Sequence, residues 1–379
     1  MTEALALRHV KAHVFRYPLS EPVRTSFGTM RDRPMVIVEV EDKDGARGYG
    51  EVWCNFPAVG AEHRARLVAS VLEPLLVARS FRDAPEAYAH ITAATAVLAL
   101  QSAEPGPFAQ AIAGVDTALW DLMARKAGEP LWRFLAPGAA PSIRVYASGL
   151  NPDAPEKLAA RKRDEGYRAF KLKIGFGKAR DLANLTALRE AVGPEARLMV
   201  DANQAWDLDT ALDYASQLDA HGLDWLEEPL RCDRPWHEWQ KLAARTQTPL
   251  AAGENISGHD RFEEALAART LRVVQPDMAK WGGFSGTLPV AKAILDAGVR
   301  FCPHYLGGGI GLLASAHLLA AVGGDGMLEI DANPNPLRTD LCGGLNHIRD
   351  GMAELSTAPG LGALPDLDAL AKFRVPSAA

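Results

Sequence analysis

Two lysines, Lys171 and Lys173, lie two residues apart in the apolar segment FKLKIG. Side chains of a strand alternate between its faces, so both ammonium groups would point to the same side of a mostly buried strand. Buried lysines are unfavourable unless acidic groups compensate them. Taken alone, the pair would also fit an edge strand that charge protects from pairing.

Acids and a histidine occupy comparable positions in other apolar segments. One carboxylate after a strand is more often a helix N-cap or a surface ion pair, and one histidine there is usually structural. Helix caps that have no common function need not occur at the same end of successive strands. Because polar residues occur there repeatedly, a shared site is favoured. The residues at these positions are Asp201, Glu227, Glu254, Asp277, His304 and Glu329.

These residues belong to a repeating pattern of short apolar segments and helical segments. Such alternation predicts a parallel (β/α)8 barrel, in which the carboxyl ends of the strands carry the catalytic groups. All of the polar residues above would then meet at one mouth. The expected strands are 143–148, 169–174, 196–201, 223–228, 248–254, 271–277, 299–304 and 326–331.

The remainder of the chain predicts a second domain. Residues 8–53 are β-rich, with a hairpin turn expected around Asp44 and Gly45, and residues 61–137 have helical periodicity. The tail contains the strand-like segment AKFRVP and is expected to return to this domain. We therefore predict an α/β fold, a modified TIM barrel over 136–334 with an α+β capping domain over 1–135 that residues 335–379 complete.

The residue types at the mouth suggest proton abstraction assisted by a metal. Asp201, Glu227 and Glu254 offer hard oxygen ligands of the kind that Mg2+ prefers. A nearby cation would lower the pKa of Lys173 toward that of a general base. Asp277 could orient His304 as a second base on the other side of the mouth. Mg2+ between the bases could hold a substrate carboxylate and stabilise an enediolate.

At these residues the sequence resembles the enolase superfamily, specifically its mandelate racemase subgroup. That superfamily uses a lysine or histidine base with Mg2+ to stabilise an enediolate, so this chemistry also follows from the resemblance. An aspartate rather than a lysine at position 277 is similar to the subgroup's pattern. The matching segments are KLK (171–173), VDAN (200–203), LEEP (226–229), GEN (253–255), QPDMAKWGG (275–283), PH (303–304), LEID (328–331) and GVDTALWDLMARKAGEPL in the N-terminal region.

The resemblance implies a role for each site residue. Lys171 and Asn203 would surround the substrate carboxylate and the metal, and Glu329 would donate a hydrogen bond to the far carboxylate oxygen. Arg24 and Trp53, in cap loops over 24–28 and 52–60, would contact the substrate. The metal ligands would be Asp201, Glu227 and Glu254, and the bases Lys173 and His304 with Asp277 orienting the latter.

The resulting expectation is an Mg2+-dependent enzyme that dehydrates an acid sugar to a 2-keto-3-deoxy acid. Racemisation or epimerisation of a 2-hydroxy acid is an alternative, because two opposed bases suffice for it. Cycloisomerisation of a sugar-acid lactone is another. A non-catalytic binding protein on a decayed barrel is disfavoured, because no ligand or base of the motif is missing.

Composition limits the partners of the chain. Its 379 residues are 48% hydrophobic and 23% charged, with a net charge of −6, which argues against nucleic-acid or anionic membrane surfaces. The N-terminus has no signal-peptide pattern, and no apolar run has membrane-spanning length. Four widely spaced cysteines indicate reduced thiols and a cytoplasmic location. The expected partners are a small carboxylate substrate and further copies of the chain in a homo-oligomer.

Overall fold

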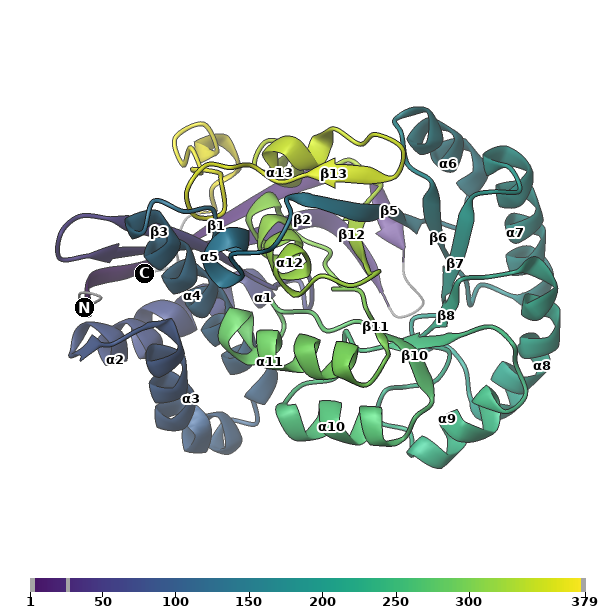
Figure 1. Cartoon of the computed structure of the whole chain (residues 1–379), viewed down its shortest axis with the longest axis horizontal. Coiled ribbons are helices and arrows are strands. Elements are labelled where there is room, and N and C mark those ends of the chain that lie inside the picture. The colour runs from purple at the N-terminus through teal and green to yellow at the C-terminus, as the bar shows by residue number, and fades with distance from the viewer. Residues whose placement is uncertain (1–3, 25–27, 376–379) are drawn as a thin grey trace.

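The computed structural model describes residues 4–24 and 28–375, and its central element is a nearly closed parallel barrel (Figure 1). All eight barrel strands expected from the sequence are confirmed. Their order in the sheet is β11-β10-β9-β8-β7-β6-β5-β12. The strands are β5 (Ser142–Leu150), β6 (Ala169–Lys173), β7 (Arg197–Asp201), β8 (Trp225–Glu227), β9 (Leu250–Ala252), β10 (Leu271–Val274), β11 (Arg300–Phe301) and β12 (Met327–Asp331).

Helices surround this sheet on its outer side (Figure 1). They bury apolar residues against the strands and leave charged residues outside, as the helical periodicity of the sequence requires. None of the helices in the described residues is long and apolar enough to span a membrane. The barrel helices are α6 (Pro155–Asp164), α7 (Lys178–Val192), α8 (Leu208–Leu218), α9 (Trp236–Ala243), α10 (His259–Ala267), α11 (Gly283–Asp296) and α12 (Gly309–Val322).

The interior of the barrel is filled by a layer of buried apolar side chains, one from each strand or from the residue that follows it. Large rings on some strands face small residues on others, and the Tyr146 ring lies edge-on to the Trp225 ring at 5.4 Å. The next inward position on each strand lies two residues further on. The layer consists of Tyr146, Ala169, Met199, Trp225, Ala251, Val273, Cys302 and Met327.

The capping domain consists of an antiparallel sheet and a helical layer. The sheet order is β3-β2-β1-β4, formed by β1 (Leu5–Arg24), β2 (Thr29–Asp42), β3 (Arg47–Val52) and β4 (Ser80–Phe81). The expected hairpin joins β2 and β3 through residues 43–46. The helices are α1 (Gly60–Leu67), α2 (Glu73–Val77), α3 (Ala84–Gln101), α4 (Pro105–Lys126) and α5 (Leu131–Leu135).

Two buried cap carboxylates hold the cap on the barrel. Glu51 in β3 accepts hydrogen bonds from the N–H groups of Gly308 (2.5 Å) and Gly311 (2.9 Å) at the start of α12. Asp116 in α4 accepts from Ser285 N (2.9 Å) and Ser285 Oγ (2.6 Å) at the start of α11. Helix N-termini expose unpaired N–H groups and favour negative charge, so each acid completes a barrel helix.

The C-terminal tail contacts both parts of the chain. Its strand β13 (Met352–Glu354) pairs with barrel strand β5, after a short helix α13 (Pro336–Thr339). Val375 N then donates to Val14 O in the cap sheet (2.9 Å), which confirms the expected return to the N-terminal region. The strand expected in AKFRVP is wrong. Residues 371–373 form a 3-10 turn that brings the Phe373 ring against Tyr17, and only Arg374 makes a bridge to the sheet.

His317 connects α12 to the segments beside it as a neutral imidazole. Its Nδ1 accepts from Trp132 N (2.9 Å), and its Nε2 donates to Leu361 O (3.3 Å). Burial lowers the pKa of His317 to about 3. Between pH 6.5 and pH 3 the histidine therefore binds a proton in the unfolded chain but not in the folded chain. The free energy of unfolding falls as the pH falls through this range.

We predict that His317→Gln reduces this pH dependence. The wild type should lose about 2 kcal/mol more unfolding free energy than the variant between pH 7 and pH 5, from linkage of one shifted group. Urea unfolding of both proteins at the two pH values measures the difference. Equal losses in wild type and variant would show that His317 already binds a proton in the folded chain.

Candidate active site

Charged residues form a second inward layer directly above the apolar layer. Asp201 and Glu227 lie two residues after Met199 and Trp225, and Glu329 lies two residues after Met327, so period-two alternation points all three inward. Lys171 lies two residues after Ala169 and is fully buried among them. Its Nζ is 2.6 Å from Glu227 Oε1 and 2.7 Å from Glu329 Oε1. The acids expected opposite the lysine pair are therefore present.

Lys173 lies above Lys171, at the end of β6. Its Nζ is 2.5 Å from Asp201 Oδ2. Burial lowers the pKa of Lys173, but the attraction of Asp201 outweighs it and the pKa is raised. From the sequence we expect a nearby cation to lower the pKa of Lys173. With the protein's own charges alone the pKa does not fall, because the attraction of Asp201 is stronger than the repulsion from the Lys171 ammonium.

His304 follows β11 and is held between two carboxylates. Its Nδ1 is 2.8 Å from Asp277 Oδ2, and its Nε2 is 2.6 Å from Glu254 Oε2. Burial lowers the pKa of His304, but Glu254 and Glu329 outweigh it and raise the pKa well above its usual value. The second Asp277 oxygen accepts from Ala279 N (2.9 Å) and Lys280 N (3.1 Å), which fixes the orientation of the carboxylate.

The site has more acids than bases. Burial, together with repulsion from Asp201 and Glu329, raises the pKa of Glu227 to about 7 despite Lys171. Burial and the neighbouring Glu254 raise the pKa of Glu228 well above its usual value. The bases in this cluster are Lys171, Lys173, Lys280 and His304, and the acids are Asp201, Glu227, Glu228, Glu254, Asp277 and Glu329.

Glu329 is an acceptor in this arrangement. It accepts from Ser148 Oγ (2.5 Å) and from Tyr305 N (3.2 Å). Burial raises its pKa, but attraction to Lys171 and His304 outweighs burial, and the pKa of Glu329 falls to about 2. With the protein's own charges Glu329 therefore accepts hydrogen bonds, and the hydrogen bond to the substrate that the resemblance implied for it stays a prediction.

A cavity of about 250 Å³ opens above the charged layer, between the barrel mouth and the cap. Lys173, Glu254 and His304 line it, as do Asn203 and Trp53. Lys171 lies below the cavity and does not line it. The side chain of Arg24 lies outside the described residues, so its predicted substrate contact remains a prediction.

Several lining residues were not expected from the sequence. Lys280 lies between the barrel and the cap, with Nζ 3.4 Å from Glu254 Oε1 and 4.9 Å from the centre of the Trp53 ring. It belongs to the QPDMAKWGG segment, so that motif was the available signal. Arg33 reaches the cavity from β2 and had no comparable signal, because it lies inside an ordinary strand pattern.

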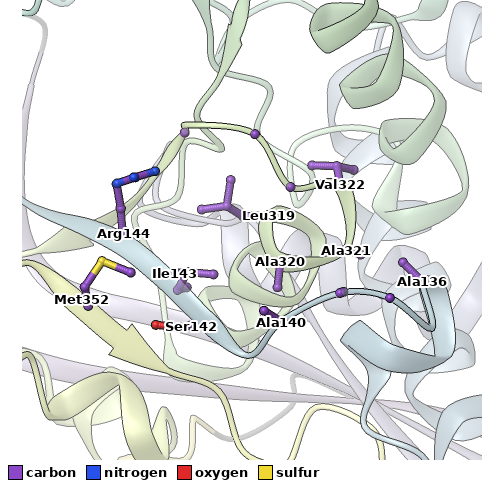
Figure 2. Close-up of a pocket in the computed structure, with 15 residues that line it drawn as sticks. Ala136, Ala140, Ser142, Ile143, Arg144, Leu319, Ala320, Ala321, Val322 and Met352 are labelled. Carbon is purple, nitrogen blue, oxygen red and sulfur yellow. The ribbon is translucent and has the colours of Figure 1, made fainter.

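A larger cavity of about 490 Å³ lies at the other end of the barrel, where β5, α12 and β13 meet (Figure 2). Alanine, glycine and aliphatic residues form most of its lining, and Arg144 is the only charged residue among those that line it. Among the described residues that line it, none has a carboxylate or imidazole that could bind a metal or transfer a proton. Its size therefore does not make it a candidate for the chemistry described above.

One further group of potential metal ligands lies in the cap sheet. His9, Glu39 and Glu41 bring ligand atoms within 4.8 Å of one another. Arg8 and Arg47 already pair with Glu41, at 3.0 and 2.8 Å, so this cluster has less need of a cation than the barrel mouth.

Comparison with known proteins places these features in a family. Residues 9–136 match the family described as "Mandelate racemase / muconate lactonizing enzyme, N-terminal domain", and residues 154–369 match "Enolase C-terminal domain-like". A solved structure described as a mandelate racemase/muconate lactonizing enzyme from Bordetella bronchiseptica RB50 is 59% identical. The match has a TM-score of 0.93 and covers 98% of this chain and 100% of that chain.

Relatives with described activities differ in their reactions. A D-galactarolactone cycloisomerase of Agrobacterium fabrum is 29% identical, covering 97% of this chain and 98% of the relative. An L-talarate/galactarate dehydratase of Salmonella typhimurium is 31% identical, covering 93% and 87%. A racemase from Streptomyces coelicolor A3(2), solved with bound magnesium, is 28% identical, with a TM-score of 0.85, and covers 97% and 100%.

We predict that Asp277→Asn lowers the pKa of His304, because the substitution removes one of the two carboxylates that contact the imidazole. An NMR titration of isotope-labelled histidine in EDTA-treated protein measures the midpoint. Asp296→Asn, an exposed acid at the end of α11, is the matched control and should leave the midpoint unchanged. An unchanged midpoint in Asp277→Asn would mean that the contact has no influence on the protonation of His304.

Proposed function

We infer the reaction of this chain from its family, because the chain belongs to the mandelate racemase subgroup of the enolase superfamily. It is therefore an enzyme, a lyase or an isomerase of the mandelate racemase type. We propose that it removes the proton next to a substrate carboxylate and then eliminates water, converting an acid sugar to a 2-keto-3-deoxy acid. The observation that carries this proposal is the convergence of Lys173 and of His304, held by Asp277, on one cavity.

The donor set at the mouth fits Mg2+. The three proposed ligands are carboxylates at neighbouring strand ends: Asp201 ends β7, Glu227 ends β8, and Glu254 is the second residue after β9. Oxygen ligands of this type suit Mg2+. Burial raises the pKa of Glu227, and repulsion from Asp201 and Glu329 adds to this rise. A divalent cation would balance that excess of negative charge. When bound by these three residues, Mg2+ would supply positive charge that stabilises the negative charge developing on the substrate carboxylate.

Lys173 and His304 have complementary roles in the proposed reaction. Mg2+ held by Asp201 would offset the negative charge that raises the pKa of Lys173. Lys173, as the free amine, would then take the proton from the carbon next to the carboxylate, and the electron pair of that C–H bond would pass into an enediolate. The enediolate then expels the hydroxyl of the next carbon, while His304 gives its Nε2 proton to the departing oxygen. Water leaves, and the enol product tautomerises to the keto acid.

His304 is placed to act as the general acid of an elimination. Asp277 Oδ2 lies 2.8 Å from His304 Nδ1, which orients the ring and stabilises the imidazolium, and His304 lines the cavity where a departing hydroxyl would lie. A general acid at a departing hydroxyl is what elimination needs, and a positioned acid or base contributes roughly 10²–10⁴-fold to a rate.

We predict that EDTA abolishes turnover and that Mg2+ restores it. Glu227→Gln should lose both turnover and Mg2+ binding measured by calorimetry, because one charged ligand is removed, while circular dichroism confirms the fold. Glu264→Gln, on the exposed surface of α10, is the matched control. Full activity of the metal-free protein would contradict the metal assignment.

We predict that the wild type releases an α-keto acid that semicarbazide traps, and that recovered substrate carries solvent deuterium next to its carboxylate if the proton transfer is reversible. Lys173→Ala and His304→Asn should each slow turnover by roughly 10²–10⁴-fold, the usual contribution of a positioned acid or base. Parallel polarimetry separates the alternatives. A change in rotation without keto acid would indicate racemisation, and turnover of a sugar-acid lactone alone would indicate cycloisomerisation.

A further inference from the structure

The cavity has a second polar end, formed by Arg33, Asn151 and Asn333, which we call the distal pocket. Asn151 follows β5 and Asn333 follows β12, and these strands are neighbours in the barrel sheet. The proposed metal ligands belong to β7, β8 and β9, which lie on the opposite side of the ring of strands. A substrate with its reacting carboxylate at the metal ligands would therefore extend its far end toward the distal pocket.

Arg33 has an unused hydrogen-bond donor at this end of the cavity. Its side chain is buried, with Nη2 2.5 Å from Asp331 Oδ2 and Nη1 3.3 Å from Met30 Sδ. Its Nε is buried and has no hydrogen-bond partner among the residues that the structure describes. A buried donor without a partner costs about 1–3 kcal/mol, which an oxygen acceptor on a ligand would recover.

Asn151 adds an unused acceptor. Its Nδ2 is 3.4 Å from Asn333 Oδ1, and its buried Oδ1 has no partner within the described part of the chain. Asn333 Nδ2 is already used, donating to Gly149 O and Asp331 Oδ1 at 2.8 Å each. The pocket thus offers a donor for a charged oxygen beside an acceptor for a hydroxyl, which suits the end of a polyhydroxylated acid.

The charge of this region is positive. Arg33 and Arg338 both lie near one carboxylate, Asp331, with Arg338 Nη1 at 3.7 Å from its Oδ2. The other oxygen, Asp331 Oδ1, accepts from Asn333 N (3.0 Å) and Asn333 Nδ2. Arg33 and Asp331 line the cavity, and Arg338 lies next to Asp331 outside the lining. Within the described residues, two buried guanidinium groups thus share one buried acid, and the excess positive charge favours an anion.

We propose that the distal pocket binds a second carboxylate, so that the substrate is a dicarboxylic acid sugar rather than a monocarboxylic one. This inference rests on the proposed function. Arg33 is its specificity-determining residue, and it acts from the cap, at the end of the cavity remote from Lys173 and His304.

The test compares matched acids that differ only at the far carbon, hexaric acids with a carboxylate there and hexonic acids of the same configuration with CH2OH. The wild type should prefer the diacid by on the order of 10²-fold in kcat/KM, the discrimination expected when a charged hydrogen-bonding group is lost. Arg33→Gln should remove most of that preference, because it should lower kcat/KM for the diacid and change kcat/KM for the monoacid little. Arg16→Met, an arginine paired with Asp32 and Glu62 outside the cavity, is the control and should keep the preference.

A second variant covers the case in which Arg33→Gln does not fold. Arg33→Met removes the guanidinium but keeps an apolar side chain of similar length, and Arg338 Nη1, 3.7 Å from Asp331 Oδ2, remains as a partner for the buried carboxylate. This variant should also lose the preference. Calorimetry of each acid with the Mg2+-loaded protein gives a readout that does not depend on turnover. Diacid binding should weaken in the Arg33 variants, and monoacid binding should change little.

The outcomes separate this inference from the proposed function. Equal or better turnover of hexonic acids by the wild type, or an unchanged diacid preference in the Arg33 variants, would overturn the distal pocket while the proposed function stands. If no acid yields an α-keto acid, the proposed function fails. In that case calorimetry alone tests the distal pocket. Diacid binding that weakens in the Arg33 variants supports the pocket, and diacid binding that does not depend on Arg33 overturns it.

Discussion

The charged layer at the barrel mouth depends on mutual compensation of buried charges. Lys171 is the centre of this arrangement, because it contacts Glu227 and Glu329 directly and lies 3.9 Å from Asp201. Its ammonium also lies 5.5 Å from the centre of the Tyr146 ring in the apolar layer below. Removing one member of such a buried set leaves another charge unpaired, which typically costs about 3–5 kcal/mol. The same charges that define the chemistry therefore also decide whether the mouth can form.

The backbone at the mouth is shaped to bring these groups together. Directly after β7 and β8, Asn203, Gln204 and Glu228 have positive φ angles of 44°, 62° and 40°. Such conformations cost on the order of 1–3 kcal/mol each in residues other than glycine. Gln204 N donates to Glu228 O (2.7 Å) across the two turns, and Asn203 N donates to Asp201 Oδ1 (2.7 Å) within the first turn, so hydrogen bonds offset part of that cost. The strain lies beside two proposed metal ligands, where sharp turns expose the carboxylates.

The sequence predicted the parts of the structure that follow from periodicity and motif. The positions of Asp201, Glu227 and His304 at the ends of apolar segments were enough to predict that they meet at one mouth, and the motifs identified the pair of His304 and Asp277. Contacts between distant segments could not be predicted in this way. Arg33 meets Asp331 across 298 positions, and Glu51 meets the start of α12 across 257, and no local pattern marks either pair. The protonation of Glu329 was also inaccessible, because it depends on how close Lys171 and His304 lie to it.

The charged layer by itself does not select among the reactions of the family. A base on β6 and a histidine after β11, facing one carboxylate cluster, can invert a centre, expel a hydroxyl or open a lactone, and the relatives include all three kinds of enzyme. What distinguishes them physically is which substrate atom lies within reach of His304. That position is determined by the groups that hold the far end of the substrate, on β5, on β12 and on the cap. Because Glu51 and Asp116 fix the cap to the N-termini of α12 and α11, small changes in cap side chains can move the substrate without disturbing the charged layer. In the proposed arrangement, the cap and the ends of β5 and β12 would therefore select the reaction, and the charged layer would supply the chemistry that the reactions share.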